Sequence, residues 1–267
     1  MDARTDAFLF DDYPAFSRHY DVTLCSKLLS NNHPNELVLN HYFDDYAMHI
    51  AHNVRTLKPA GGKDYREGKD RDLLGLCRQH SQAYARHLEG DSTIVITHPF
   101  YLHLSHMQDI ETVNTRKEVQ NYLERILEMV RMERDRQAVN MVALDTIHHY
   151  AATTSLLLEK GEIDRVIFTR YNQGIVLDKD ELADFADHDI FICGGYDGFC
   201  LTQAIENFNE FVSQDRIWAI RDVSIASPKW NRKSLVLDTV SGIDDSQVVG
   251  LADVLCSLGM NEHSDMT

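Results

Sequence analysis

Short apolar runs alternate with amphipathic stretches along the chain from Ser92 onward. The runs are rich in β-branched residues and are bounded by polar or glycine-containing segments, a pattern typical of buried strands. The stretches between them place apolar residues three or four positions apart, which is typical of helices packed on one side. The predicted strands are 93–97, 139–144, 165–169, 189–193 and 216–221, and the predicted helices between them are 119–130, 153–159, 178–185 and 199–212. Because strands that alternate with helices form right-handed parallel units, the pattern predicts an α/β, Rossmann-like three-layer sandwich with a mostly parallel central sheet.

The pattern divides the chain into three parts. Residues 1–90 include a stretch of helical spacing over 73–88 and are predicted to form a helical N-terminal extension. Residues 91–260 form the predicted α/β domain, in which Ser234 to Val240 is a candidate edge strand. Residues 261–267 are a polar tail.

Three segments carry the sequence signature of a helix N-terminus. A residue with a short polar side chain is followed three positions later by Glu or Gln, which allows each side chain to bond the other's backbone amide. The segments are Thr115 to Glu118, Asp178 to Glu181, and Asp244 to Gln247. The last of them predicts a helix that extends through Leu258.

Composition narrows the classes of function. The 267 residues carry a formal net charge of −16, which disfavours nucleic acid or an anionic membrane as a partner because phosphates would be repelled. The five cysteines, at 25, 77, 193, 200 and 256, are odd in number and scattered, which favours a reducing compartment over a disulfide framework. With no signal-peptide pattern at the N-terminus and no apolar run of membrane-spanning length, the sequence predicts a cytoplasmic protein.

The predicted strand ends supply the candidate catalytic residues. Ligands of open α/β sheets bind outside the carboxyl ends of the strands, where this chain places His98, Asp145, Arg170 and the segment from Gly194 to Cys200. Cys200 opens a helix after a glycine turn, and the positive end of a helix can lower a thiol pKa, so Cys200 is a candidate nucleophile. His98 or Asp145 would act as base or orienter and Arg170 as a clamp for an anion. The alternative is that Cys200 packs under its helix as a small hydrophobic residue.

A resemblance to a known family covers residues 165–222. It rests on the segments Ile167-Phe-Thr-Arg-Tyr-Asn-Gln-Gly174, Asp178 to Phe185, Ile190-Phe-Ile-Cys-Gly-Gly-Tyr-Asp-Gly-Phe-Cys200-Leu-Thr-Gln-Ala204 and Ile217-Trp-Ala-Ile-Arg-Asp222. Together they resemble the second half of the isochorismatase-like cysteine hydrolases. The resemblance implies a three-layer Rossmann-like fold and an Asp–Lys–Cys triad with Cys200 as nucleophile.

This chain departs from the family's triad at two positions. Arg170 stands near the place of the family's lysine, and Thr97-His98-Pro99 stands where the family has its first-strand aspartate. Asp145 ends the second predicted strand instead. The interpretation is a hydrolase that acts on an amide, ester or related C–X bond of a small-molecule substrate.

Three other interpretations remain open. His103, His106 and His148 lie near His98 and Asp145 after the first two strands, and such a set can hold a divalent metal. Glycines before a helix can also cradle a phosphate-bearing cofactor; they are Gly194, Gly195 and Gly198. The third interpretation is a catalytically silent binding or scaffold protein, in which the N-terminal helices form a homo-oligomer interface.

Overall fold

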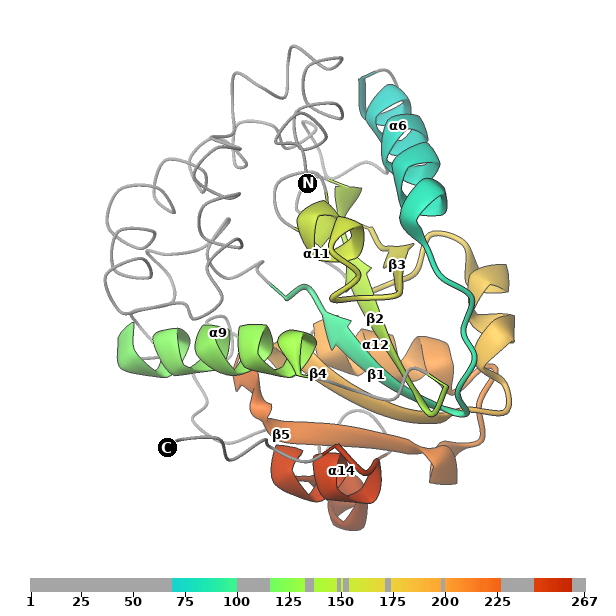
Figure 1. Ribbon diagram of the computed structural model, residues 1–267. Helices are drawn as coiled ribbons and strands as arrows, with labels where there is room; N and C mark the ends of the chain where they lie inside the picture. Colours follow the sequence, from blue (N-terminus) through green and yellow to red (C-terminus); the bar gives the residue numbers. More distant parts are fainter. Residues whose placement is uncertain are drawn as a thin grey trace.

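The five predicted apolar runs, together with Val248–Val249, form the six strands of one parallel sheet in the computed structural model of the protein (Figure 1). The structure describes residues 69–99, 116–132, 137–147, 150, 154–170, 174–197, 200–226 and 243–260. The strands are β1 (Ser92–Thr97), β2 (Val139–Asp145), β3 (Arg165–Phe168), β4 (Asp189–Asp197), β5 (Ile217–Ala226) and β6 (Val248–Val249). Their order across the sheet is β3-β2-β1-β4-β5-β6, and every neighbouring pair is parallel. This order confirms the predicted α/β, Rossmann-like class.

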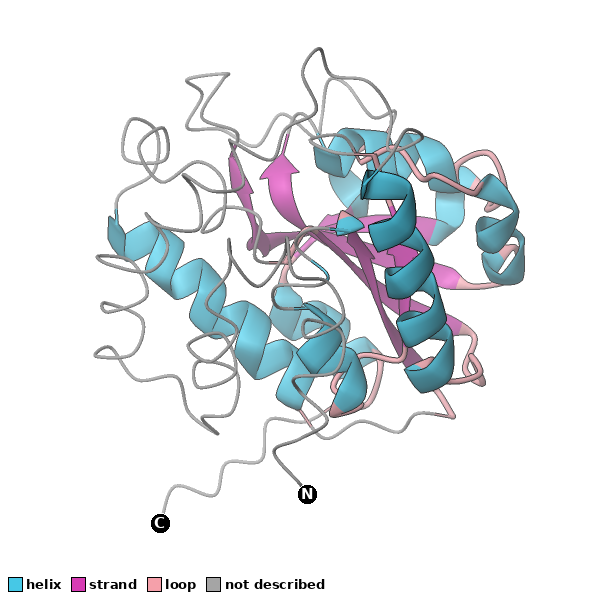
Figure 2. Cartoon of the chain, turned by 90° about the horizontal axis from the view of Figure 1, so that it is seen from above, coloured by secondary structure: helices cyan, strands magenta, loops and turns pink. Residues whose placement is uncertain are grey.

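Helices cover both faces of the sheet. Figure 1 shows α9 (Arg116–Arg131) in front of the strands and α12 (Cys200–Phe208) behind them, and Figure 2 shows helices on both sides from above. The remaining helical elements are α6 (Lys69–Tyr84), α11 (Ser155–Glu159), η3 (Lys179–Phe185), η4 (Gln214–Arg216), η6 (Asp245–Gln247) and α14 (Leu251–Ser257). The fold is therefore three layers, as the alternation of strands and helices requires.

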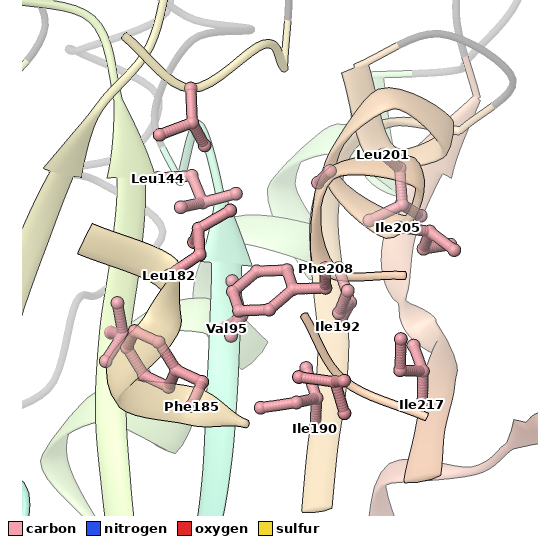
Figure 3. Close-up of a cluster of buried hydrophobic side chains, with 14 of the residues drawn as sticks. Val95, Leu144, Leu182, Phe185, Ile190, Ile192, Leu201, Ile205, Phe208 and Ile217 are labelled. Atoms are coloured by element: carbon pink, nitrogen blue, oxygen red, sulfur yellow. The ribbon is translucent and has the colours of Figure 1, made fainter. Parts of the chain in front are cut away.

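The core on the α12 side is built from alternate residues of the strands. Val95 on β1, Leu144 on β2 and Ile192 on β4 pack with Leu201 and Phe208 of α12, as Figure 3 shows. All of these side chains are fully buried. Partner residues of neighbouring parallel strands point to the same face, and successive residues of one strand point to opposite faces. The cluster therefore also tells which face of the sheet the residues at the strand ends point to.

Gly194 and Gly195 lie inside a strand and not in a turn, which corrects the predicted strand end. β4 continues through Asp197 and pairs with an equally extended β5 through Ala226. The pairing is irregular between Ile192 and Gly194, where Gly194 has a φ of +109°. Gly194 adopts this conformation easily because it has no side chain, so the strand bends and continues where the sequence predicted that it stops.

Two of the predicted helix starts are also corrected. Residues 179–185 form a 3₁₀ helix, and the Asp178 side chain makes no capping hydrogen bond. The predicted box at Asp244 and Gln247 does form, but it caps the short η6, which is followed by β6 before α14 begins. Thr115 and the predicted edge strand at 234–240 lie outside the described residues.

The C-terminal part of the predicted extension packs on the α/β layers. α6 lies beside α11 and β3, and the Cys77 thiol on α6 donates to the Ile147 carbonyl at 3.7 Å. His80 on the same helix contacts the Tyr150 hydroxyl at 2.7 Å and Glu159 at 2.9 Å. Across the part of the chain that is described, no helix has the length and apolar character needed to cross a membrane.

Candidate functional site

Three of the predicted site residues meet at the place where the strand order reverses. β1 is paired with β2 on one side and with β4 on the other, so the chain changes direction across the sheet between β1 and β4. His98 follows β1, Asp145 ends β2, and Cys200 begins the helix after β4. This reversal is where open α/β sheets form a crevice for ligands.

The Asp145 carboxylate lies against the His98 ring. Asp145 Oδ1 is 3.3 Å from His98 Nδ1, and both side chains are at most 1% exposed. The carboxylate also accepts hydrogen bonds from the Thr146 amide at 2.9 Å and from the Thr154 hydroxyl at 2.5 Å. Because a carboxylate can only accept hydrogen bonds, Nδ1 carries the proton in this contact, and the other ring nitrogen is the one that can act as a base.

His98 is held in a strained backbone conformation. Its φ is +47°, and it is the only non-glycine residue with a positive φ in the described part of the chain. The following proline adds to the strain because a residue before proline is pushed toward extended backbone. The surrounding structure holds this turn in place, since the His98 amide donates to the Leu144 carbonyl at 2.8 Å and the Tyr122 hydroxyl donates to the Pro99 carbonyl at 3.3 Å. Strain of this kind costs about 1–3 kcal/mol and clusters at functional sites.

Cys200 also lies close enough to His98 to affect the pKa of the imidazole. Burial opposes the imidazolium and by itself would lower the pKa of His98, but hydrogen bonds to Asp145 and Cys200 and their negative charges outweigh it and raise the pKa to about 9. The Cys200 side chain is fully buried at the first position of α12. The thiol, the imidazole and the carboxylate therefore stand in the spatial order of a nucleophile, its base and the group that orients the base.

The loop after β3 packs against the backbone of Cys200. An isolated bridge joins Thr169 to Val176, and the Arg170 amide donates to the Ile175 carbonyl at 2.9 Å. A Cβ atom added at Gly174 would lie 2.0 Å from the Cys200 carbonyl oxygen, so only glycine allows this approach. The half-buried Arg170 therefore stands on a loop that reaches the start of α12.

The predicted phosphate glycines have a different place. Gly194 lies on β4 beside Thr97, and a Cβ atom there would be 2.2 Å from the Thr97 carbonyl oxygen. Gly195 pairs with Ile225 within the same extended strand. Gly194 therefore allows the central strands to approach each other beside His98, while Gly198 lies outside the described residues.

The predicted metal ligands His103, His106 and His148 also lie outside the described residues. Within the ranges that are described, no group of three or more His, Cys, Asp or Glu side chains is placed to hold a metal ion.

Three residues at the site were not identified from the sequence. Thr154 contacts Asp145, Tyr122 holds the turn after His98, and Gly174 lies against Cys200. Tyr122 is part of the apolar face of a predicted helix, and nothing in its spacing shows that its hydroxyl has a partner on another element. A glycine that follows polar residues after a strand is the one signal that pointed at Gly174, and it indicates only a turn.

Comparison with protein-family models, curated proteins and solved structures finds no match for this chain.

Proposed function

We propose that the protein is a cysteine hydrolase that acts on an amide, ester or related C–X bond of a small molecule. The observation that carries the proposal is the buried contact of His98 with Asp145 at the strand-order reversal, with Cys200 close enough to affect the pKa of His98. This triad differs from the Asp–Lys–Cys set that the sequence resemblance implies, because His98 stands after the first strand, where the family has its aspartate, and the carboxylate is that of Asp145 at the end of the second strand.

The reaction follows from the order of the three groups. The Cys200 thiol gives its proton to His98, and the sulfur attacks the carbonyl carbon to form a tetrahedral adduct. The adduct collapses when its C–X bond breaks, and the leaving group takes the proton from His98, which leaves a thioester on Cys200. Water then gives a proton to His98 and adds to the thioester, the C–S bond breaks, and the proton returns to the thiolate. The products are the acid and the amine or alcohol.

The surroundings favour this chemistry. The three side chains are buried, so water does not screen the interaction between imidazolium, thiolate and carboxylate. Asp145 holds the tautomer of His98 in which the ring can take the thiol proton. Arg170, at the same edge of the sheet, is proposed to bind an anionic group of the substrate.

The test is alkylation of the native full-length protein by iodoacetamide, followed at each cysteine by mass spectrometry over a range of pH. Cys200 is expected to react fast at about pH 6–7, well below the ordinary thiol pKa of about 8.5. His98→Gln is expected to remove this low-pH reactivity because the base is lost. Cys193→Ser is the matched control: it also removes a fully buried thiol from the β4–α12 region, and it should leave the Cys200 rate unchanged.

Cys193 and Cys77 provide internal references for inert thiols. Burial, reinforced by the negative charge of Asp222, raises the pKa of Cys193 far above its ordinary range, and burial together with Asp145 does the same for Cys77. A Cys200 that reacts as slowly as these two, or that reacts equally fast in His98→Gln, would contradict the proposal. A stoichiometric metal in the same sample together with an inert Cys200 would favour the histidine metal site instead.

A further inference from the structure

Thr154 makes a short hydrogen bond to the carboxylate that faces His98. Its Oγ1 donates to Asp145 Oδ2 at 2.5 Å, a distance typical of a hydroxyl bonded to an ionised carboxylate. Asp145 Oδ1, on the other side of the group, accepts from the Thr146 amide at 2.9 Å and lies 3.3 Å from His98 Nδ1. The two carboxylate oxygens are thus held from two directions, which restricts rotation of a group whose terminal torsion is otherwise broad.

The location of Thr154 favours this contact over a packing role. Thr154 is fully buried and lies immediately before α11. Apart from this bond, no described contact joins α11 to Cys200, His98 or Asp145. A buried hydroxyl is costly unless it is hydrogen-bonded, and valine would fill nearly the same volume without that cost. The hydroxyl is therefore explained by its bond to Asp145.

We propose that Thr154 is a positioning residue of the Cys200 site, whose hydroxyl keeps the Asp145 carboxylate ionised and aimed at His98. The inference rests on the proposed function and extends it by one contact, from the Asp145 carboxylate that orients His98 to the Thr154 hydroxyl that orients Asp145. Other titratable groups also face this region: Cys77 from α6 and Tyr122 from α9 interact with Asp145, and Cys200 from α12 interacts with His98. None of these is changed by a substitution at Thr154.

The test compares Thr154→Val, Thr154→Ala and Thr154→Ser in the full-length chain by NMR titration of the His98 imidazole, assigned with His98→Gln. Without the hydroxyl, the buried carboxylate rotates or takes up a proton, and either change weakens its contact with His98. Thr154→Val and Thr154→Ala are therefore expected to lower the His98 titration midpoint by at least about 1 pH unit, since a hydrogen bond to a charged group is worth more than one pKa unit. Thr154→Ser keeps the hydroxyl and should titrate like the unmodified protein.

A midpoint that is unchanged or higher in the folded Val or Ala variant, or equally lowered in Thr154→Ser, would overturn the inference. Alkylation supplies a second measurement. In the unmodified chain, Thr154→Val should slow the reaction of Cys200, and in a chain that already carries Asp145→Asn it should have no further effect. If Thr154 only packed, Thr154→Val would slow the reaction equally in the two chains. The His98 titration needs no reaction at Cys200. A shifted midpoint with an inert Cys200 would thus refute the proposed function alone, and an unshifted midpoint with a reactive Cys200 would refute the role of Thr154 alone.

Discussion

Replacing Gly194 with alanine tests the close approach of the two central strands. A Cβ atom at this position would lie 2.2 Å from the Thr97 carbonyl oxygen, 2.8 Å from its nitrogen and 2.9 Å from its carbonyl carbon. All three are backbone atoms of the neighbouring strand β1, so no side-chain rotation can relieve the contact. The φ of +109° adds a second penalty, because side chains with a Cβ rarely adopt it.

Gly259→Ala separates the two penalties. Gly259 also has a positive φ, +67°, but no atom lies within 4 Å of the position its Cβ would take. The backbone penalty alone costs roughly 1–2 kcal/mol, which is the loss expected for Gly259→Ala. Overpacking adds about 1–3 kcal/mol, so Gly194→Ala should lose about 2–5 kcal/mol in the free energy of unfolding.

The assay is urea denaturation of both variants and the parent protein, followed by circular dichroism at constant pH. A further variant, Gly75→Ala, has open space at a helical position and should be stable or slightly stabilised, by about 0.5–1 kcal/mol. Equal losses for Gly194→Ala and Gly259→Ala would refute the reasoning, because the contact with Thr97 would then contribute nothing.

Three further predictions concern the site and the opposite edge of the sheet. The pKa of His98 is raised to about 9 in the folded state, so the contribution of His98 to stability is fully present below pH 6.5 and is lost as the pH rises through about 9. The difference in unfolding free energy between the parent and His98→Gln, measured by urea titration, should therefore fall by about 3 kcal/mol over this range. A difference that grows with pH would contradict this prediction. Gly174→Ala should displace the start of α12, because its Cβ would lie 2.0 Å from the Cys200 carbonyl oxygen. The alkylation of Cys200 should then be slower, while the alkylation of the exposed Cys256 should be unaffected. An unchanged Cys200 rate would show that the loop does not position the thiol. The Asn140 side-chain amide donates to the Gly90 and Ser92 carbonyls and accepts from the Glu89 backbone amide. Asn140→Leu should therefore lower the free energy of unfolding by about 2–4 kcal/mol. A thermal melt that shows no loss of stability would contradict this prediction.

The sheet could be predicted from sequence because its strands are buried on both faces. Runs such as Thr93 to Thr97 and Val139 to Leu144 are almost entirely apolar or β-branched, and in the structure they fall within β1 and β2. The rule that ligand sites lie at the carboxyl ends of strands was enough to select His98, Asp145 and Cys200 as one group. The structure places His98 in contact with Asp145 and near Cys200, while the catalytic roles of all three stay predictions.

The remaining features depend on partners that lie far away along the chain. β4 extends past its glycines because β5 offers backbone groups to pair with, and no local signal at Gly194 shows this. The residues 179–185 curl into a 3₁₀ helix in which Leu182 and Phe185 reach the core, so tertiary packing and not the local capping pattern decided the form. Thr154 and Asp145 lie nine residues apart in the chain, and sequence spacing cannot reveal which buried hydroxyl meets which carboxylate.

Under the proposed function, the pairing of β1 with β4 would decide when the Cys200 thiol becomes reactive. His98 and Asp145 follow or end strands of the first three and Cys200 follows β4, and within the sheet the two sets of strands are joined by the β1–β4 ladder. A nascent chain that has not yet added β4 holds the imidazole and carboxylate without the sulfur, and an isolated C-terminal fragment would hold the sulfur without its base. The nucleophile would thus be assembled only by the most distant strand pairing at the centre of the sheet, so that recovery of alkylation at Cys200 during refolding would time the joining of the two halves.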